Sequence, residues 1–344
     1  MNMKNKIYIT GANGWLGRNL LEYLAKVDPE IHCIVLLEPG DDKNFLIGDT
    51  SIKDLQTTIE WGNITDEHSC SRFLSNSEGS TVIHLAGVIH PNKYRDFHSV
   101  NFLGTKNISD LCLKNNVKKL IYLSSNSPYG TNKKGELFDQ HSPYKPYLGY
   151  GKSKMEAETY ITQLRKEGLK SNILKAPWFY GPHQPLRQTT FFNMIKKGLF
   201  PLIGNGKNLR SMTYTKNLAH AIYLCYINKE VDNLDFWIAD EKAYSFRYIL
   251  ETIREVMIQE YKINVPKNKL RLPHFFGEIA YFFDLLIQKI GLYNQEIHVM
   301  GEVNKNIACD IDYTKKKLGY YPKYNIKSGM KESLDWLVKN GFKL

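Results

Sequence analysis

The stretch KIYITGANGWLG, residues 6–17, decides the fold. A run of β-forming residues, 6–10, leads directly into a Gly-x-x-Gly-x-x-Gly turn, and residues 15–26 follow with leucines at helical spacing. Such glycines allow a tight turn and a close backbone approach to a ligand, and the start of the helix offers free N–H groups to an anion. A plain strand-to-helix turn is the alternative. We predict that the turn binds a dinucleotide pyrophosphate through Gly11, Asn13, Gly14, Trp15, Leu16 and Gly17.

Apolar β runs alternate with helical patterns through the first half of the chain. Further strands are predicted at 31–37, 57–61, 81–86, 119–124 and 171–176, and helices at 66–74, 94–115 and 150–166. This alternation is typical of an α/β protein in which helices cover both faces of a doubly wound parallel sheet, as in the Rossmann fold.

The sequence pattern changes after Ala176, where Pro177, Gly181-Pro182 and Pro185 indicate loops. Shorter helices are predicted near 191–197, 215–228, 245–259 and 328–338, and a strand near 235–239 that returns to the main sheet. We therefore expect a dinucleotide-binding domain over 1–176, completed by about 205–244, and a smaller interleaved substrate-binding part formed by 177–204 and 245–344.

Bulk composition excludes several other classes. The N-terminus lacks the apolar region of a signal peptide, and no uncharged apolar run is long enough to span a membrane, so a cytoplasmic protein is expected. The five cysteines are scattered, which predicts neither a metal site nor a disulfide framework. The net charge of +11 comes from short dispersed basic runs that match no nucleic-acid-binding module. A positive field would also favour an anionic substrate.

Glu38 stands at the end of the second predicted strand, about twenty residues past the glycine turn. This is where a Rossmann domain places a carboxylate for the adenosine ribose hydroxyls. A carboxylate repels a 2′-phosphate, and no basic residue follows before Lys43, so NAD is favoured over NADP. A surface carboxylate at a strand end is the alternative.

A hydride transfer between an alcohol and a ketone needs a proton acceptor, and a tyrosine serves if a nearby lysine ammonium favours its phenolate. On a helix, Tyr-x-x-x-Lys places both side chains on one face. The chain contains three such pairs, Tyr129/Lys133, Tyr150/Lys154 and Tyr313/Lys317. The first lies in a stretch broken by glycines, and the third lies near the C-terminus, beyond the predicted sheet. Tyr150/Lys154 begins a helical pattern one strand after Ser124-Ser125, at the edge where doubly wound sheets bind ligands.

Together these motifs, with several others in the same order, resemble an extended short-chain dehydrogenase/reductase of the NAD-dependent nucleotide-sugar epimerase/dehydratase superfamily. The resemblance covers nearly the whole chain. It is carried by the glycine turn, His84-Leu85-Ala86-Gly87, Asn101-x-x-Gly104-Thr105, Ser124-Ser125-x-x-x-Tyr129-Gly130, Tyr150-Gly151-Lys152-Ser153-Lys154, Tyr180-Gly181-Pro182 and Gly204-x-Gly206…Arg210-Ser211.

The resemblance implies roles for single residues. Ser125 and Tyr150 would hold and deprotonate the reacting hydroxyl, and Lys154 would also bind the nicotinamide ribose. The further cofactor-binding residues would be Asn63, Ile64, Leu85, Ala86, Gly87 and Asn101, and the further substrate-binding residues Asn126, Trp178 and Arg210. Purely structural roles for Asn101 and Arg210 are the alternatives. A homodimer formed through the helices near 94–115 and 150–166 is also implied by the family.

Departures from the family pattern narrow the reaction. Sugar-nucleotide dehydratases carry acidic residues just after the catalytic serine or threonine, whereas this chain has Asn126 and Ser127. Water elimination needs a general acid and base there, so we expect no dehydratase activity. Ser127 also replaces the cysteine of epimerase/reductases similar to GDP-fucose synthase. The remaining expectation is a 4-epimerase or 4-keto reductase that acts on a nucleotide-sugar.

Two observations keep a second function open. Trp178 occupies a position where many sugar-nucleotide enzymes have an asparagine, and residues 273–293 form a strongly apolar segment. Both features, with the stretch 214–219, resemble the 3β-hydroxysteroid-dehydrogenase-like branch, which acts on apolar alcohols. The apolar segment could be an ordinary buried helix, the wall of a lipid pocket or a membrane-surface helix. A protein that only binds NAD is a third reading, against which the Ser125/Tyr150/Lys154 set argues.

Overall fold

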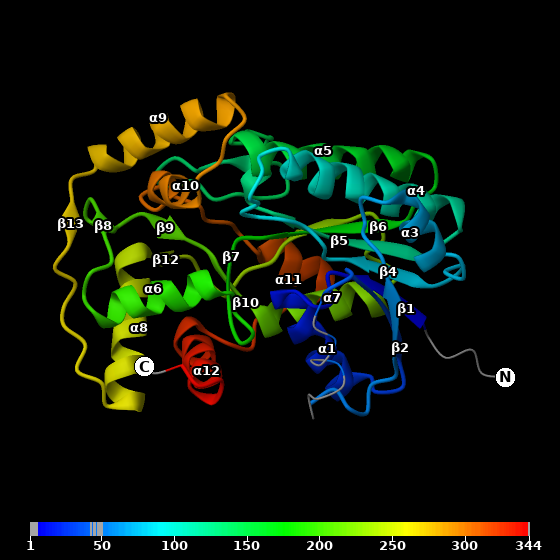
Figure 1. Ribbon diagram of the computed structural model, residues 1–344, viewed down its shortest axis with the longest axis horizontal. Coiled ribbons are helices and arrows are strands. Elements are labelled where there is room, and N and C mark those ends of the chain that lie inside the picture. Colours follow the sequence, from blue (N-terminus) through cyan, green and yellow to red (C-terminus); the bar gives the residue numbers. More distant parts are fainter. Residues whose placement is uncertain (1–5, 42, 44–45, 47–50, 343–344) are drawn as a thin grey trace.

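The computed structural model describes residues 6–41, 43, 46 and 51–342. Its centre is a seven-stranded sheet in the order β11-β6-β5-β4-β1-β2-β3, and every neighbouring pair in it is parallel (Figure 1). The predicted α/β class and Rossmann topology are confirmed. The strands are β1 (Lys6–Thr10), β2 (His32–Leu37), β3 (Thr57–Trp61), β4 (Thr81–His84), β5 (Lys119–Ser125), β6 (Ser171–Ala176) and β11 (Asp235–Trp237).

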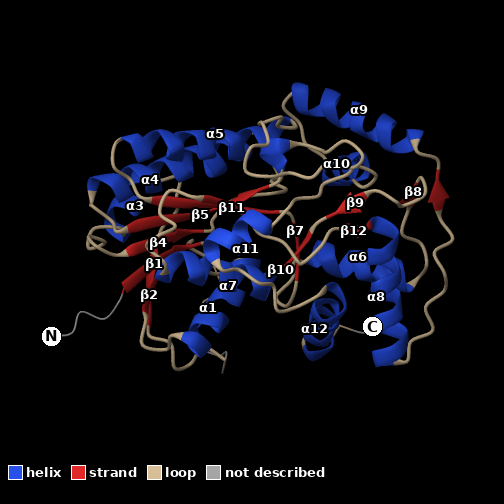
Figure 2. Ribbon diagram, turned by 180° about the vertical axis from the view of Figure 1, so that it is seen from behind, coloured by secondary structure: helices blue, strands red, loops and turns tan. Residues whose placement is uncertain are grey.

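Helices cover both faces of this sheet, as right-handed crossovers between parallel strands require (Figures 1 and 2). One face carries α3 (Glu67–Phe73), the π-helical turn η1 (Phe97–Gly104), α4 (Thr105–Lys114) and α5 (Leu148–Lys166). The other face carries α1 (Trp15–Val27), α7 (Thr215–Ile227) and α11 (Asp312–Leu318). The chain order reverses between β1 and β4, so their carboxyl ends open a crevice for a ligand.

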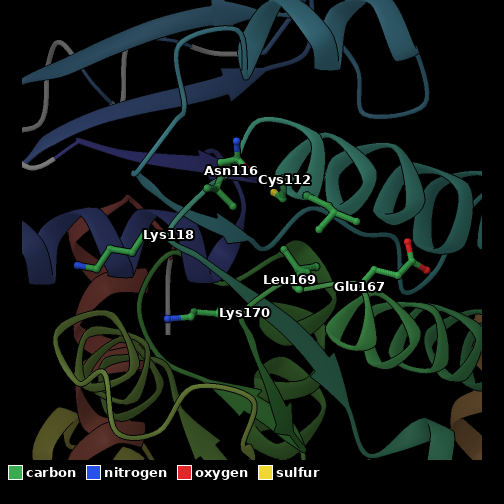
Figure 3. Close-up of a pocket in the computed structure, with 9 residues that line it drawn as sticks. Cys112, Asn116, Lys118, Glu167, Leu169 and Lys170 are labelled. Atoms are coloured by element: carbon green, nitrogen blue, oxygen red, sulfur yellow. The ribbon is translucent and has the colours of Figure 1, made fainter.

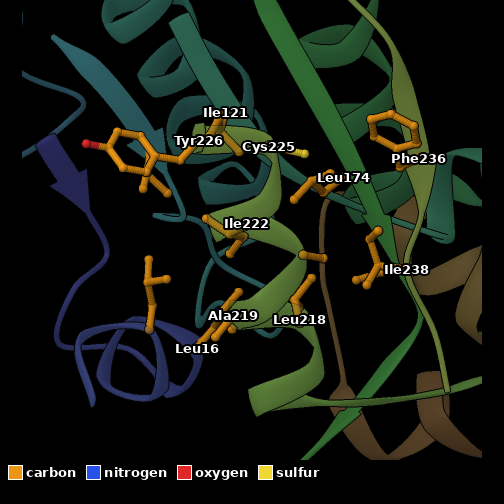
Figure 4. Packing of buried hydrophobic residues seen from close by; sticks show 14 of the residues in the cluster. Leu16, Ile121, Leu174, Leu218, Ala219, Ile222, Cys225, Tyr226, Phe236 and Ile238 are labelled. Atoms are coloured by element: carbon orange, nitrogen blue, oxygen red, sulfur yellow. The ribbon is translucent and has the colours of Figure 1, made fainter. Parts of the chain in front are cut away.

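The largest core cluster lies between the sheet and the α1/α7 face. Figure 4 shows Leu218, Ile222 and Cys225 of α7 turned toward Ile121 and Leu174 of the central strands. These side chains are buried, and burial of a large apolar side chain contributes about 1.5–3 kcal/mol. The sheet is thereby held as a firm platform for the residues at its carboxyl edge.

A second part with its own core follows β6. Its short strands are β7 (Trp178–Tyr180), β8 (Leu202–Ile203), β9 (Leu209–Arg210), β10 (Met212–Tyr214), β12 (Tyr244–Ser245) and β13 (Arg271–Leu272). Its helices are α6 (Leu186–Lys196), α8 (Phe246–Tyr261), α9 (Phe275–Lys289), α10 (Gln295–Glu302) and α12 (Ile326–Lys339). A separate apolar cluster built from α6, α8, α12 and these strands fills its interior.

Several elements differ from the sequence prediction. The helix predicted over 94–115 is a π-helical turn followed by α4, and α6 begins at Leu186, earlier than predicted. Helices α10 and α11 were not predicted, and α11 contacts α7 and β11 although its residues fall in the range assigned to the substrate-binding part. The domain boundaries stay a prediction. In the described part of the chain no helix is long and apolar enough to cross a membrane.

Candidate active site

The glycine turn joins β1 to α1 at the crevice between β1 and β4. Gly11 has φ +72°, and a Cβ there would lie 2.6 Å from the backbone nitrogen of Ala86. Gly14 caps α1, and no side chain satisfies the first N–H groups of that helix. The turn can therefore approach a ligand closely and present backbone donors to it, which fits a dinucleotide pyrophosphate.

Two side chains of the turn have structural partners. The Trp15 indole donates to the carbonyl oxygens of Gly181 (3.2 Å) and Pro182 (2.8 Å), which ties α1 to the loop after β7. Asn13 accepts a 2.6 Å hydrogen bond from the Arg18 guanidinium. The backbone of both residues remains placed for the predicted cofactor contact, and the predicted side-chain roles stay predictions.

The cofactor positions that follow β2 and β3 lie at the same edge. Glu38 directly follows β2, and partial desolvation of its carboxyl group and the nearby Asp41 raise the pKa of that group. Asn63 accepts 2.8 Å bonds from the backbone and hydroxyl of Thr65, and Ile64 is buried beneath Gly104. Ile64 can thus offer a ligand only its backbone.

The loop after β4 is held by Asn101. The Asn101 side chain accepts from the backbone N–H of Val88 at 2.8 Å and donates to the Val88 carbonyl at 2.9 Å and to Ser153 at 3.2 Å. Ser153 in turn donates to the carbonyl of Tyr150 at 2.8 Å. Asn101 therefore connects the predicted Leu85-Ala86-Gly87 cofactor loop to the helix that carries Tyr150.

The catalytic candidates converge at the carboxyl end of β5. Ser125 is its last residue, and Tyr150 and Lys154 lie one turn apart on α5. Before Tyr150 the helix is kinked at Gly149 (φ +31°), where a Cβ would lie 2.7 Å from the Gln288 side chain. The kink lets α5 begin against α9 and still direct Tyr150 toward the sheet.

The pKa of Tyr150 departs from the sequence-based expectation. Burial raises it to about 12, while a hydrogen bond with Ser125 and the positive charge of Arg187 act to lower it. Lys154 was expected to provide the lowering charge. Its ammonium instead donates a 2.7 Å bond to the Leu123 carbonyl and lies 4.2 Å from the Tyr122 ring centre, so its charge is directed at β5.

The pKa of Lys154 is also shifted, and the neighbouring Glu158 contributes to that shift. Burial lowers the pKa of Lys154 to about 7, and the carboxylate of Glu158 acts in the opposite direction. Glu158 is fully buried and accepts hydrogen bonds from Ser124, Tyr129 (2.7 Å) and Tyr144 (2.9 Å). Glu158 was not predicted as a site residue, although its place four residues after Lys154, on the same helix face, was an available signal.

On the substrate side, Arg210 lies over Trp178. The guanidinium carbon is 5.8 Å from the indole ring centre, and one terminal nitrogen donates to the Glu302 carbonyl at 3.2 Å. The Arg210 Nε is buried and has no hydrogen-bond partner among the described residues. A buried charged donor without an acceptor fits an anionic ligand group. Asn126 begins the short turn after Ser125, beside the reacting centre.

Two groups from the second half of the chain lie at the start of α5, and neither was predicted from the sequence. Arg187, in the first turn of α6, acts electrostatically on Tyr150 and Tyr293. The second group lies on α9 and α10, where Asp284 accepts a 2.8 Å hydrogen bond from His298. No sequence motif connects these helices to α5, so only the tertiary structure reveals them.

The hollow drawn in Figure 3 is a different feature. Residues at the ends of α4 and α5 line it, among them Cys112, Asn116, Glu167 and Lys170. It opens at the amino ends of β5 and β6, the edge opposite to Ser125. Ligands of doubly wound sheets bind at the carboxyl edge, so the hollow is not the candidate active site.

The comparisons with known proteins agree with this geometry. Residues 7–238 match the family described as the NAD dependent epimerase/dehydratase family, and the chain belongs to that family. It is an enzyme family of the extended short-chain dehydrogenase/reductase type, and its cofactor is NAD.

Single relatives span more than one activity. The chain is 38% identical to the uncharacterized protein y4nL of Sinorhizobium fredii, over 97% of this chain and 96% of the relative. It is 24% identical to the 3beta-hydroxysteroid-dehydrogenase/decarboxylase isoform 2 of Arabidopsis thaliana, over 95% of this chain and 61% of the relative. The UDP-glucose 4-epimerase structure from Thermotoga maritima superimposes with a TM-score of 0.74 at 22% identity, covering 97% of this chain and 99% of that one. This structural likeness shows the fold.

Proposed function

We propose that this protein interconverts a sugar hydroxyl and the corresponding ketone on a nucleotide-sugar, as a 4-epimerase or 4-keto reductase. The observation that carries the proposal is the unpaired Arg210 donor, which shares the charged neighbour Glu302 with Tyr150 of the Ser125/Tyr150/Lys154 set. A guanidinium pairs well with a diphosphate, and the same ligand would then reach the catalytic residues with its sugar.

Ser125 and Tyr150 have different roles in the proposed reaction. The Ser125 hydroxyl holds the reacting oxygen, and the Tyr150 phenolate takes the hydroxyl proton. The Gly11–Gly17 turn and Lys154 would hold NAD, which would supply the hydride chemistry at the alcohol carbon. Burial holds the pKa of Tyr150 near 12 although the Ser125 hydrogen bond and the charge of Arg187 act to lower it, so the phenolate needs positive charge in addition to that of Arg187. In an epimerase, Tyr150 gives the proton back after the ketone has presented its other face.

The residues after Ser125 support the exclusion of dehydration. Asn126 and Ser127 are neither acids nor bases, and Ser127 uses its backbone N–H to donate a 3.3 Å bond to the Ser125 oxygen. Elimination of water needs a general acid and base beside the reacting sugar, which this segment does not provide. We further propose that the protein is cytoplasmic and forms a homodimer through η1/α4 and α5.

The test begins with mass spectrometry of small molecules that co-purify with the protein, followed by binding of UDP-, GDP-, dTDP- and CDP-sugars. We expect retained NAD and one tightly bound nucleotide-sugar. Arg210→Gln should weaken that sugar at least tenfold, about the loss of one charge-assisted hydrogen bond, and leave NAD retention unchanged. NAD retained without any nucleotide-sugar binding would contradict the proposal.

One observation favours a second candidate, a dehydrogenase of apolar alcohols. Trp178 contacts the Phe191 ring at a tilted angle (5.4 Å between ring centres) and stacks on Phe246 (6.2 Å), which gives the substrate side an aromatic wall. Such a wall would accept a ring system without a diphosphate. Turnover of sterols or long-chain ketones, with no binding of nucleotide-sugars, would establish this candidate.

A further inference from the structure

Helix α9 carries its apolar residues on the outside. Seven large hydrophobic side chains of this helix are exposed, and at 100° per residue they fall within an arc of about 120°. They are Phe275, Phe276, Ile279, Phe282, Phe283, Leu286 and Ile290. We name this set the α9 stripe, counting Ile290 as the residue that ends the helix.

The opposite side of α9 is polar and buried. The buried residues of α9 are Gly277, Asp284 and Gln288, and Asp284 accepts hydrogen bonds from Tyr147 (2.6 Å) and Gln288 (2.8 Å). A surface helix of a globular protein normally has the reverse pattern, with its apolar side inward. Contiguous exposed apolar surface of this extent marks an interaction site.

The charges around the stripe indicate what covers it. Residues 271–292 contain one Arg and one Lys, which are Arg271 on β13 just before α9 and Lys289 in the last turn of α9, and both are exposed. The segment has two carboxylates, and neither forms an ion pair with these two cations. Asp284 is buried, and Glu278 is paired with Lys305 at 2.5 Å. Apolar side chains flanked by exposed cations are the features with which an interfacial helix binds an anionic lipid surface.

The position of α9 also suits a broad, fluid surface. Figures 1 and 2 both show α9 along the outer border of the molecule, with α10 on its inner side. Phe282 and Phe283 are 58% and 53% exposed, and Ile290 is 72% exposed. These side chains stand on a ridge, which can enter the boundary between headgroups and acyl chains without a shaped pocket in the partner.

We propose that the α9 stripe docks this protein on the surface of an anionic lipid bilayer. The docked helix would lie parallel to the membrane. Its polar side would pack against the start of α5, where Tyr147 donates a hydrogen bond to Asp284. A helix is about 10 Å thick, so the start of the catalytic helix α5 would lie close to the membrane surface, with α9 between them. This inference goes beyond the proposed function and holds for either substrate class.

Vesicle flotation with the full chain tests the proposal. We expect the protein to float with phosphatidylcholine vesicles that contain about 30% phosphatidylglycerol, and to float much less with phosphatidylcholine alone. The double variant Phe282→Ser/Phe283→Ser should bind the anionic vesicles at least tenfold more weakly. Lys289→Gln should weaken binding about fivefold, the value of one cation near an anionic surface.

A matched control separates the stripe from exposed apolar residues elsewhere. Ile227 and Tyr321 are 52% and 64% exposed and lie outside α9, so Ile227→Ser/Tyr321→Ser should float like the wild type. Thermal unfolding and NAD retention verify that each variant is folded. Nucleotide-sugar binding is measured in the same preparations. A failure of the proposed function can then be distinguished from a failure of membrane docking.

Three results would overturn the proposal. The wild type could remain unbound with both vesicle types, or the double variant could float as well as the wild type. The third result is a dimer in light scattering that Phe282→Ser/Phe283→Ser splits while no form of the protein floats. That result would make the stripe an interface between two copies of the chain.

Discussion

The phenol of Tyr147 donates a 2.6 Å hydrogen bond to the carboxylate of Asp284, and this bond joins α5 to α9. Tyr147 precedes Tyr150 by one helical turn, and its ring stacks on Tyr281 with 4.6 Å between the centres. The two residues are far apart in the chain, and no local pattern pairs them. The contact makes the start of the catalytic helix dependent on a distant helical hairpin.

We therefore expect Tyr147→Phe to destabilise the protein by about 1.5–3 kcal/mol, the usual value of a hydrogen bond to a charged group. The ring stacking survives in this variant, so the change isolates the hydroxyl. Chemical denaturation, read as the free energy of unfolding, measures the effect. Tyr321→Phe, at an exposed position, should change stability by less than about 0.5 kcal/mol. An equal effect of both variants would show that the bond contributes nothing specific.

His298, the other partner of Asp284, predicts a dependence of stability on pH. Burial lowers the pKa of His298, but Glu302 and the 2.8 Å bond to Asp284 outweigh burial and leave the pKa above 6.5. A raised histidine pKa stabilises the folded state fully below the unfolded value, and this contribution is lost as pH rises through the folded value. The nearby His90 stays neutral, because burial and the positive charge of Arg187 lower its pKa to about 3.

The expected result follows for His298→Gln. The variant should lose more unfolding free energy, relative to wild type, at about pH 5.5 than at about pH 8.5. Burial raises the pKa of Asp284, but its bonds to His298 and Tyr147 leave it below 3.8, so Asp284 stays ionised over this range. Denaturant titrations of both proteins at the two pH values measure the difference. A loss that is independent of pH would mean that His298 is neutral in the folded protein.

Gly11 and His298 differ in whether their positions in the fold could be predicted from the sequence. Gly11, Ser125, Tyr150 and Lys154 belong to local patterns whose strand, turn or helix can be recognised directly, so their place at the carboxyl edge could be predicted. Arg187 acts on Tyr150, and His298 packs on Tyr147 at the start of α5, only because two separate parts of the chain pack together. The polar inner side of α9 is similar in kind, because Asp284 follows no amphipathic rule and is explained by its partners on α5 and α10.

The assignment of the general base is tested by Tyr150→Phe. Without the phenol oxygen the reacting hydroxyl has no proton acceptor, so kcat should fall by about 10²- to 10⁴-fold while NAD stays bound. The matched control is Tyr313→Phe, since Tyr313 belongs to another Tyr-x-x-x-Lys pair, on α11. This control should retain full activity. An unchanged kcat in Tyr150→Phe would mean that the phenol is not the general base.

Glu158 should control the charge of Lys154. Burial lowers the pKa of Lys154 to about 7, and the Glu158 carboxylate limits that decrease. Glu158→Gln removes the negative charge, so the pKa of Lys154 should fall further and the ammonium should be lost at a lower pH. NMR titration of the Lys154 side chain measures this shift. Glu156→Gln is the control, because Glu156 lies on the same helix and pairs with His98 and Lys152. An unchanged Lys154 pKa in Glu158→Gln would indicate that Glu158 is protonated.

The last prediction concerns Glu38 and the choice of cofactor. Its carboxylate follows β2 at the edge where the adenosine ribose would lie, and a 2′-phosphate at that place would meet a like charge. We expect the wild type to bind NAD at least tenfold more tightly than NADP. Glu38→Ser should weaken NAD, because an acceptor for the ribose hydroxyls is lost, and strengthen NADP, because the repulsion is removed. Titration of both dinucleotides against both proteins gives the four dissociation constants. Parallel weakening of NAD and NADP in Glu38→Ser would mean that Glu38 supports the loop and does not select the cofactor.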